Sequence, residues 1–399
     1  MKGLTFRTAT TLFTFIIGIG AAMAWSFHSR SAAIQPIPVA VGTNPGNAPA
    51  LEMVFVIDTT GSMGGLIEGA KQRVWGIVNE VMQSSSHPAV SIGLVAYRDH
   101  GDQYVTQVLP LTNDLDKVYS VLMDYQAAGG GDGPEDVRQA LADGVGRAGW
   151  SKASAQVAQI IFLVGDAPPH DDYLNEPDTI TTASEAVQRG MIVNTIQCGQ
   201  MGGTKEVWQA IAKRGQGQYF SIAQDGGVQA ITTPYDDQLG ALAKKLGGTY
   251  LAYGGGAGAA GESYRAELNT AAVMIEDKVS ASAKPSAQAD RAANKAMNSM
   301  AYVGDLLQSI ENGSVKLESV KAEDLPSDLR KLSPAERKVE IEKRLAARRE
   351  LRAQIVTLAK QRDEFIATER KKQAGGKQSG FDAAVAEALK EQLARKGIK

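Results

Sequence analysis

Two acidic residues and two hydroxyl residues stand where short apolar runs end, and together they could bind a metal ion. Asp58 ends one apolar run, and Thr60 and Ser62 follow it in the same turn. Asp166 closely follows the most hydrophobic run, residues 160–164. Open α/β sheets bind ligands outside the carboxyl ends of their strands. Carboxylate and hydroxyl oxygens suit Mg²⁺, Mn²⁺ or Ca²⁺ better than Zn²⁺. The sequence therefore predicts a site for a hard divalent cation, with Mg²⁺ preferred.

The elements that would position these residues lie between residues 51 and 253. The chain of 399 residues is 43% hydrophobic and 22% charged, which excludes a mainly disordered chain and a multi-span membrane protein. Apolar runs alternate with amphipathic segments, which predicts a mostly parallel sheet buried on both faces. The runs 90–97 and 104–109 are separated by only six residues, so this pair is antiparallel. We expect a doubly wound, Rossmann-like α/β domain with one antiparallel edge strand, followed by an α-helical C-terminal region.

The segment Asp58-Thr59-Thr60-Gly61-Ser62 resembles a known metal-binding motif. It is similar to the metal-ion-dependent adhesion motif of von Willebrand factor type A domains, Asp-x-Ser-x-Ser, with Thr in the third place. Residues 164–169 resemble the later strand and aspartate of that family, and residues 194–199 its fifth strand. The resemblance covers residues 51–253. It implies that Asp58, Thr60 and Ser62 form the first loop of a metal site, and that Asp166 contacts the ion directly or through water.

The middle loop of the implied site departs from the family pattern. The family uses a Thr there, whereas residues 129–136 contain none. Asp132 is the substitute that we expect, although it could instead cap the helix that starts at Pro134. A third acidic ligand would bind the ion more tightly but would lower its residual charge, and so weaken its attraction for an acidic partner.

Further polar residues lie near the same edge of the predicted sheet. Asp99 and His100 follow the second strand, and His170 follows Asp166 closely. These residues could form a second metal site or an acid–base pair. A polar loop rim is the preferred interpretation, because no His-x-x-x-His or similar ligand spacing is present.

The remainder of the chain predicts helices. A Gly/Ala-rich linker, residues 254–262, precedes an Ala-rich helical region, 263–330, and a charged tail, 331–399. The tail has 18 Lys and Arg against 10 Asp and Glu. It alternates both signs and has no interleaved aromatic residues, which excludes a nucleic-acid partner and favours a solvated helical face. The tail resembles C-terminal regions of bacterial proteins with this architecture.

Two helices are predicted within the charged tail. Ser333 as the cap and Glu336 three residues later indicate the start of a long helix. Its apolar seam is interrupted by Arg348 and Arg362, so we expect a helical hairpin or a weak coiled coil. A final amphipathic helix spans residues 381–395, with one apolar face.

The N-terminus predicts export. Residues 1–25 combine positive charge, a short apolar run and a small-x-small cleavage pattern, as in a signal peptide, and residues 8–25 could alternatively remain as an anchor in the inner membrane. Residues 26–50 read as a linker, so the rest of the chain is expected in the periplasm or outside the cell. Cys198 is the single cysteine, which excludes an intramolecular disulfide and indicates a buried small hydrophobe.

The resemblance implies a metal-dependent protein-binding module of the cell envelope. A partner's Asp or Glu side chain would complete the coordination of the ion, and no covalent bond would be made or broken. An envelope scaffold that self-associates through its C-terminal helices is an alternative. A phosphoryl-transfer hydrolase with Asp58 as nucleophile is a weaker one, because Thr60 stands where dehalogenase-like enzymes need a second Asp, and no phosphate-binding loop is present. We therefore expect no enzymatic activity.

Overall fold

A computed structural model describes most of the chain after the predicted export segment. The predicted signal or anchor, residues 1–25, lies outside the described residues, as does nearly all of the linker 26–50. No helix among the described residues combines the length and hydrophobicity that a membrane span requires. The described ranges are 49–82, 88–227, 231–298, 300–372 and 380–398.

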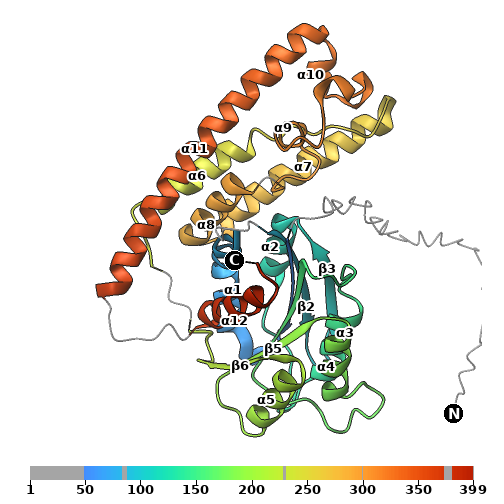
Figure 1. Ribbon diagram of the computed structural model, residues 1–399, viewed down its shortest axis with the longest axis vertical. Coiled ribbons are helices and arrows are strands. Elements are labelled where there is room, and N and C mark those ends of the chain that lie inside the picture. Colours follow the sequence, from blue (N-terminus) through green and yellow to red (C-terminus); the bar gives the residue numbers. More distant parts are fainter. Residues whose placement is uncertain (1–48, 83–87, 228–230, 299, 373–379, 399) are drawn as a thin grey trace, which may run out of the picture. The chain divides into compact units, whose positions relative to one another are not determined.

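A six-stranded mixed sheet in the order β3-β2-β1-β4-β5-β6 forms the centre of the α/β part (Figure 1). All neighbouring strands are parallel except β2 and β3, which are antiparallel. The predicted fold class, including the antiparallel edge strand, is therefore confirmed. The strand order reverses direction between β1 and β4, which is the position where such sheets bind ligands. The strands are β1 (Ala50–Asp58), β2 (Ala89–Tyr97), β3 (Thr106–Thr112), β4 (Val157–Gly165), β5 (Ile192–Cys198) and β6 (Gln216–Ile222).

Helices cover both faces of the sheet. Side chains alternate along each strand, so Met53, Phe55 and Ile57 of β1 pack into one apolar cluster and Val54 and Val56 into the other. Burial on both faces explains why β1 is a continuous apolar run. The helices of the first face are α1 (Gly64–Met82), α2 (Leu115–Asp124) and α12 (Phe381–Arg395), and those of the second are α3 (Val137–Gly146), α4 (Thr179–Gln188) and α5 (Thr204–Arg214).

The last helix, α12, belongs to the α/β layer although it is far away in sequence. The chain leaves this layer after β6 and returns at Phe381, whose backbone N–H donates to the carbonyl of Gly226 at 2.9 Å. The apolar face predicted for residues 381–395 is buried against the sheet and α1, with Val385 fully inaccessible and Leu389 3% exposed. A buried amide pair joins Gln392 of α12 to Asn194 of β5, with bonds of 2.6 and 3.0 Å. In the sequence, the helical region is therefore inserted between two segments of one α/β layer.

The helical region has apolar clusters of its own. Leu246, Ala292 and Ile355 share one cluster, whereas Leu306 and Leu345 belong to another. Its α-helices are α6 (Asp236–Gly247), α7 (Gly258–Ser282), α8 (Pro285–Met297), α9 (Leu306–Glu311), α10 (Ser327–Arg330) and α11 (Pro334–Lys372). Its 3₁₀ turns are η2 (Leu317–Ser319) and η3 (Ala322–Asp324).

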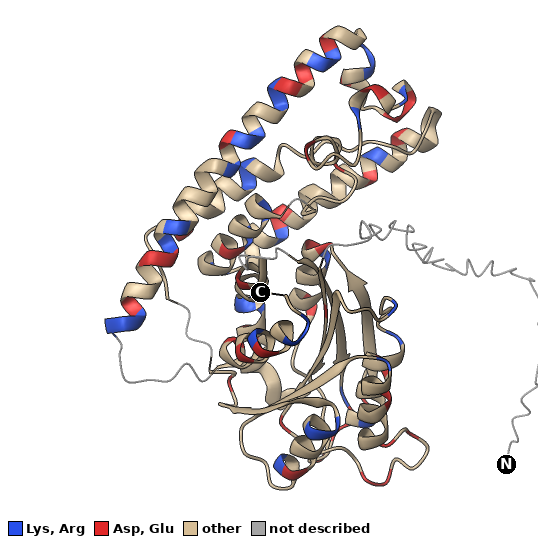
Figure 2. Cartoon of the chain, viewed as in Figure 1, with Lys and Arg blue, Asp and Glu red and all other residues tan. Residues whose placement is uncertain are grey.

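Helix α11 begins with the predicted capping box. The Ser333 backbone N–H donates to Glu336 Oε2 at 2.9 Å, and the Glu336 N–H donates to Ser333 Oγ at 3.3 Å. Basic and acidic residues are interspersed along the helix (Figure 2). Arg348, which interrupts the predicted apolar seam, is fully buried and lies 2.7 Å from the carboxylate of Asp305. The charged residue that interrupts the apolar seam therefore forms a buried ion pair inside the helical region.

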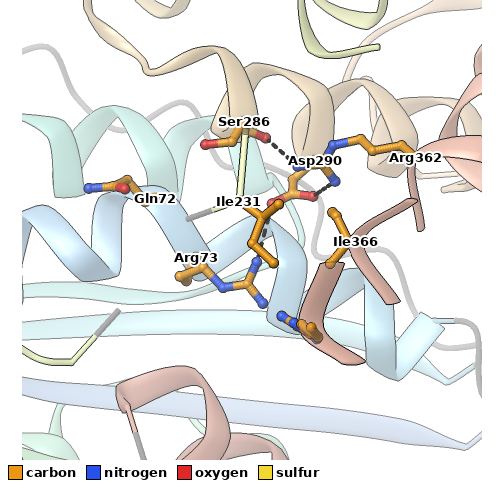
Figure 3. Close-up of a pocket in the computed structure, with 8 residues that line it drawn as sticks. Gln72, Arg73, Ile231, Ser286, Asp290, Arg362 and Ile366 are labelled. Atoms are coloured by element: carbon orange, nitrogen blue, oxygen red, sulfur yellow. Dashed lines mark hydrogen bonds and ion pairs between the residues drawn. The ribbon is translucent and has the colours of Figure 1, made fainter. Parts of the chain in front are cut away.

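A second buried ion pair joins α11 to α8 and the α/β layer (Figure 3). Asp290 of α8 lies between two arginines: its Oδ1 is 2.6 Å from Arg362 Nη1, and its Oδ2 is 3.8 Å from Arg73 Nη1. The carbonyl of Ser286 accepts a further bond from Arg362 at 3.2 Å. These contacts fix the helical region to α1.

Candidate metal centre

Asp58 ends β1 and points one carboxylate oxygen into a buried space without a partner. The backbone N–H and the hydroxyl of Thr60 donate to Asp58 Oδ1 at 2.8 and 2.6 Å. Oδ2 is buried and has no hydrogen-bond partner among the described residues. Asp58 is fully inaccessible and Thr60 1% exposed. The first loop therefore orients Asp58 and leaves one of its oxygens available for a cation.

Asp166 lies beside Asp58, as the sequence predicts for the ends of β1 and β4. A glycine is needed at position 165, because a Cβ there would overlap the Tyr97 hydroxyl and lie 3.2 Å from Asp58 Oδ2. Gln224 donates to Asp166 Oδ2 at 2.6 Å. The structure thus brings these two acidic groups to the reversal point of the sheet.

Glu135 is a third buried acidic residue of this centre, and the sequence did not reveal it. Glu135 is 4% exposed, and its Oε2 has no hydrogen-bond partner among the described residues. A Cβ on Gly130 would lie 2.9 Å from Glu135 Oε1 and 3.2 Å from Cβ of Thr60, which places these groups together. Glu135 therefore occupies the place expected for the middle-loop ligand. The only signal in the sequence is that this loop contains three acidic residues, and composition cannot tell which one is buried.

The glycines of the middle loop make this placement of Glu135 possible. Gly129 and Gly130 have φ angles of 80° and 77°, in the left-handed region that favours glycine. The Gly130 N–H donates to Asp102 Oδ2 at 3.0 Å, and the Gly61 N–H donates to the Gly129 carbonyl at 3.1 Å. A side chain on Gly129 would overlap the carboxylate of Asp102. The loop is therefore held against both the first loop and the end of β2.

The structure places Ser62 and Asp132 differently from the three buried acids. Ser62 is exposed in the 3₁₀ turn η1 (Gly61–Met63), where its carbonyl accepts a bond from Gln224 at 3.3 Å. The Asp132 side chain is 59% exposed and lies 3.6 Å from His170. The alternative role of Asp132 as a helix cap is wrong, because the cap of α3 is Asp136, which accepts from the Gln139 N–H at 2.9 Å.

The electrostatics of the centre favour a bound cation. Burial raises the pKa of Asp58 to about 7, and repulsion from Asp166 adds to this effect. Burial also raises the pKa of Glu135 to about 9, together with repulsion from Asp58. Buried carboxylates without a counter-charge are costly to ionise. The two unpartnered oxygens and the missing positive charge therefore fit a hard divalent cation, which Asp58, Glu135 and Asp166 would hold with the help of Thr60.

The predicted rim residues lie beside this centre and contact one another through an aromatic ring. Tyr173 stacks against His100 on one side and His170 on the other, with ring centroids 4.1 Å apart in both cases. The Tyr173 hydroxyl donates to Asp99 Oδ1 at 2.8 Å. His100 Nε2 lies 2.9 Å from Glu176 Oε1. The rim is thus an ordered cluster of acidic and imidazole groups.

Two matched variants separate the roles of Glu135 and Asp132. We expect Glu135→Gln to weaken Mg²⁺ binding at least about tenfold, because it removes a buried charged ligand. Asp132→Asn is expected to leave Mg²⁺ affinity within about twofold, because this side chain is exposed and faces His170. Isothermal titration of both variants with Mg²⁺ checks the prediction, and the reverse ranking would return the middle-loop role to Asp132.

Comparison with known proteins finds similarities over the α/β part. Residues 52–234 match the model of the family described as the von Willebrand factor A domain. Von Willebrand factor A domain-containing protein 7 of Rattus norvegicus is 31% identical over 186 residues, which are 46% of this chain and 19% of that protein. The protein of the same name from Homo sapiens is 34% identical over 134 residues, 33% of this chain and 14% of that protein. The chain thus spans less than a fifth of the length of these relatives. The crystal structure of the SpRpn10 VWA domain aligns with a TM-score of 0.33 and 19% identity, over 44% of this chain and 89% of that one.

Proposed function

Because residues 52–234 match the model of the von Willebrand factor A domain, we propose that this protein binds a partner protein through a divalent cation held at the ends of β1 and β4. Domains of this family are commonly protein-interaction modules. The observation that carries the proposal is the pair of buried, unpartnered oxygens, Asp58 Oδ2 and Glu135 Oε2, on two carboxylates that repel each other, with Asp166 beside Asp58. A bound cation, Mg²⁺ in first place and Mn²⁺ or Ca²⁺ as alternatives, would attract a carboxylate oxygen of the partner.

The residues around the ion set the strength of that attraction. When a bound cation keeps Asp58, Glu135 and Asp166 all ionised, the three carboxylates carry more negative charge than a divalent cation neutralises. The residual attraction for one carboxylate is therefore weak, so a partner protein must add contacts outside the centre. We propose that the partner presents an Asp or Glu on such a wider surface, and that no nucleic acid is involved.

We further propose that the centre binds without catalysis. Asp58 Oδ1 is occupied by two hydrogen bonds from Thr60, and Thr60 cannot replace the second Asp that dehalogenase-like chemistry needs. A phosphoryl-transfer role for Asp58 thus lacks the residue that would protonate the leaving group.

Export to the periplasm or the cell exterior, with residues 8–25 as the anchor if the signal is retained, is part of the proposal. It is supported by the sequence pattern of residues 1–25. Self-association through the C-terminal helices is a separate prediction. The apolar face of α12 is covered by the sheet of the same chain, whereas α11 exposes Val339 and Val356 and α7 exposes Val273 and Met274, so α11 and α7 offer apolar surface to a second copy.

The proposal is tested by titrating the full chain with Mg²⁺. Asp58→Ala is expected to lower the affinity more than about 100-fold, because the ligand nearest the centre of the site is lost. Asp237→Ala, an exposed acidic residue at the start of α6, is the matched control and should bind as the parent does. Equal Mg²⁺ affinity of the parent and Asp58→Ala would refute the metal site.

The partner is tested by capture from a membrane and periplasmic fraction on the immobilised full chain. A protein retained in Mg²⁺, released by chelator and not retained by Asp58→Ala would support the proposal. A protein retained equally well in chelator would contradict metal-dependent recognition. Release of phosphate from a model phosphoester in the absence of any partner would instead support the hydrolase.

A further inference from the structure

Three side chains from three different loops converge beside the proposed Mg²⁺ centre. Asp99 follows β2, Asp132 lies in the middle loop, and His170 follows β4. His170 Nε2 is 3.3 Å from Asp99 Oδ2 and 3.6 Å from Asp132 Oδ1. One ligand atom from each of the three lies within 4.8 Å of the other two.

The contacts of the His170 ring leave its Nε2 atom available to bind a metal ion. Its Nδ1 is 2.9 Å from Asp172 Oδ1, a carboxylate oxygen that can only accept, so in the neutral ring Nδ1 carries the proton and Nε2 the lone pair. His170 is 8% exposed, and Nε2 has no hydrogen-bond partner among the described residues. Nε2 thus lies within ion-pair distance of Asp99 and Asp132 but is hydrogen-bonded to neither.

The distances from His170 Nε2 to the two carboxylates, 3.3 and 3.6 Å, are close to those between ligands of one tetrahedral ion. Two atoms that are each 2.0–2.1 Å from a tetrahedral Zn²⁺ lie about 3.3–3.4 Å apart. Imidazole nitrogen also favours Zn²⁺ and similar transition metals over Mg²⁺ and Ca²⁺. We propose that Asp99, Asp132 and His170 form a second metal site, selective for Zn²⁺, next to the oxygen-lined centre at Asp58.

The surrounding residues hold two of the three ligands in place. Tyr173 donates its hydroxyl to Asp99 Oδ1 at 2.8 Å, which leaves Oδ2 directed toward His170. The Tyr173 ring also stacks on the His170 ring at 4.1 Å and an interplanar angle of 9°. Such outer contacts orient ligands and are typical of built metal sites. Asp132 is the exposed ligand and completes the site from the middle loop.

The second imidazole of the rim serves as an internal comparison. His100 lies near Asp136 and Glu176, but its side chain is 49% exposed and its Nε2 is within hydrogen-bond distance of Glu176, at 2.9 Å. Unlike His170, His100 is thus already hydrogen-bonded at Nε2, and it provides a control for His170 from the second acidic and imidazole group of the rim.

The position of the site implies that Zn²⁺ would stabilise the middle loop. The backbone N–H of His170 donates to the Glu135 carbonyl at 3.3 Å, and the Glu135 N–H donates to the Pro168 carbonyl at 3.1 Å. Zn²⁺ at this site would join Asp132, at the other side of the same loop, to the segment after β4. The loop that presents Glu135 would then be held at both ends.

The experiment is a Zn²⁺ titration of the full chain in excess Mg²⁺, in competition with a chromophoric chelator, supported by Co²⁺ absorption spectra. We expect one Zn²⁺ per chain, with Co²⁺ bands that indicate nitrogen ligation in a site of low coordination number. His170→Gln should weaken Zn²⁺ more than about 100-fold, and Asp172→Asn about 10- to 100-fold. His100→Gln should leave the affinity unchanged.

Asp132→Asn keeps the proposal testable if His170→Gln does not fold, because the Asp132 side chain is exposed. We expect it to weaken Zn²⁺ about tenfold while leaving Mg²⁺ binding intact. Asp58→Ala should keep Zn²⁺ while losing Mg²⁺, so failure of one site is distinguishable from failure of the other. No Zn²⁺ uptake, or equal affinity of the parent and Asp132→Asn, would overturn the proposal and leave His170 as an imidazolium paired with acids.

Discussion

A chain that ends at Gly380 is expected not to fold into a stable α/β layer. It would lack α12, which buries Phe381, Val385, Leu389 and Leu393 against the sheet and α1. Burial of each such side chain contributes about 1.5–3 kcal/mol, and a whole domain is stable by only about 5–15 kcal/mol. The loss would therefore consume most or all of the stability. Urea unfolding followed by near-ultraviolet circular dichroism measures it.

Point variants in α12 give the same prediction a graded form. Leu389→Ala is expected to lower the free energy of unfolding by about 2–5 kcal/mol. Glu387→Ala, on the exposed side of the same helix, should change it by less than about 0.5 kcal/mol. A truncated chain with the parent's urea midpoint, or equal effects of the two point variants, would contradict the packing of α12 on the sheet.

Arg291→Met is expected to lower the free energy of unfolding by about 3–5 kcal/mol, because it leaves buried acids without their counter-charge. The Arg291 side chain is 1% exposed and lies 2.7 Å from both Asp116 of α2 and Glu276 of α7. Burial by itself would raise the pKa of Asp116, but Arg291 and Lys295 outweigh it and lower that pKa. Arg291 thus joins the α/β layer to the helical region through charge. Urea unfolding of the full chain is the measurement.

A double variant separates charge imbalance from lost packing. Arg291→Met combined with Asp116→Leu removes one charge of each sign and leaves Lys295 paired with Glu276 at 2.7 Å. We expect this variant to regain a large part of the stability, since apolar replacement of a whole buried pair is often neutral. The double variant could instead unfold at a still lower free energy than Arg291→Met alone. That result would show that lost packing, and not unbalanced charge, causes the destabilisation.

Local pattern predicted several elements of this chain. The short link after residue 97 predicted the antiparallel pair that β2 and β3 form. The final amphipathic helix was predicted over the residues that α12 occupies. Periodicity specifies that a helix has an apolar face, but not what covers that face. The sheet as its cover follows only from tertiary structure.

The sequence alone could not predict which polar residues are buried and what they contact. Arg348 appeared as an interruption of an apolar seam, yet it is fully buried against Asp305. In the middle loop, Asp132 was chosen as the metal ligand, whereas the buried acid beside Asp58 is Glu135. The burial of Arg348 depends on a partner more than 40 residues away along the chain. The position of Glu135 depends on the backbone path of a glycine-rich loop. Neither leaves a periodic signal.

The contact between Gly226 and Phe381 has a practical consequence for dissecting this protein. Both junctions of the helical region lie at one point, since the Phe381 N–H donates to the Gly226 carbonyl. A truncated chain ending near residue 253 would keep α6 and discard the helix that seals the sheet. Excision of the intervening segment, with Gly227 spliced to Gly380 through a few flexible residues, should instead yield a compact module that retains Asp58, Glu135 and Asp166. The α/β layer of this protein is discontinuous in sequence, with the helical part inserted between β6 and α12.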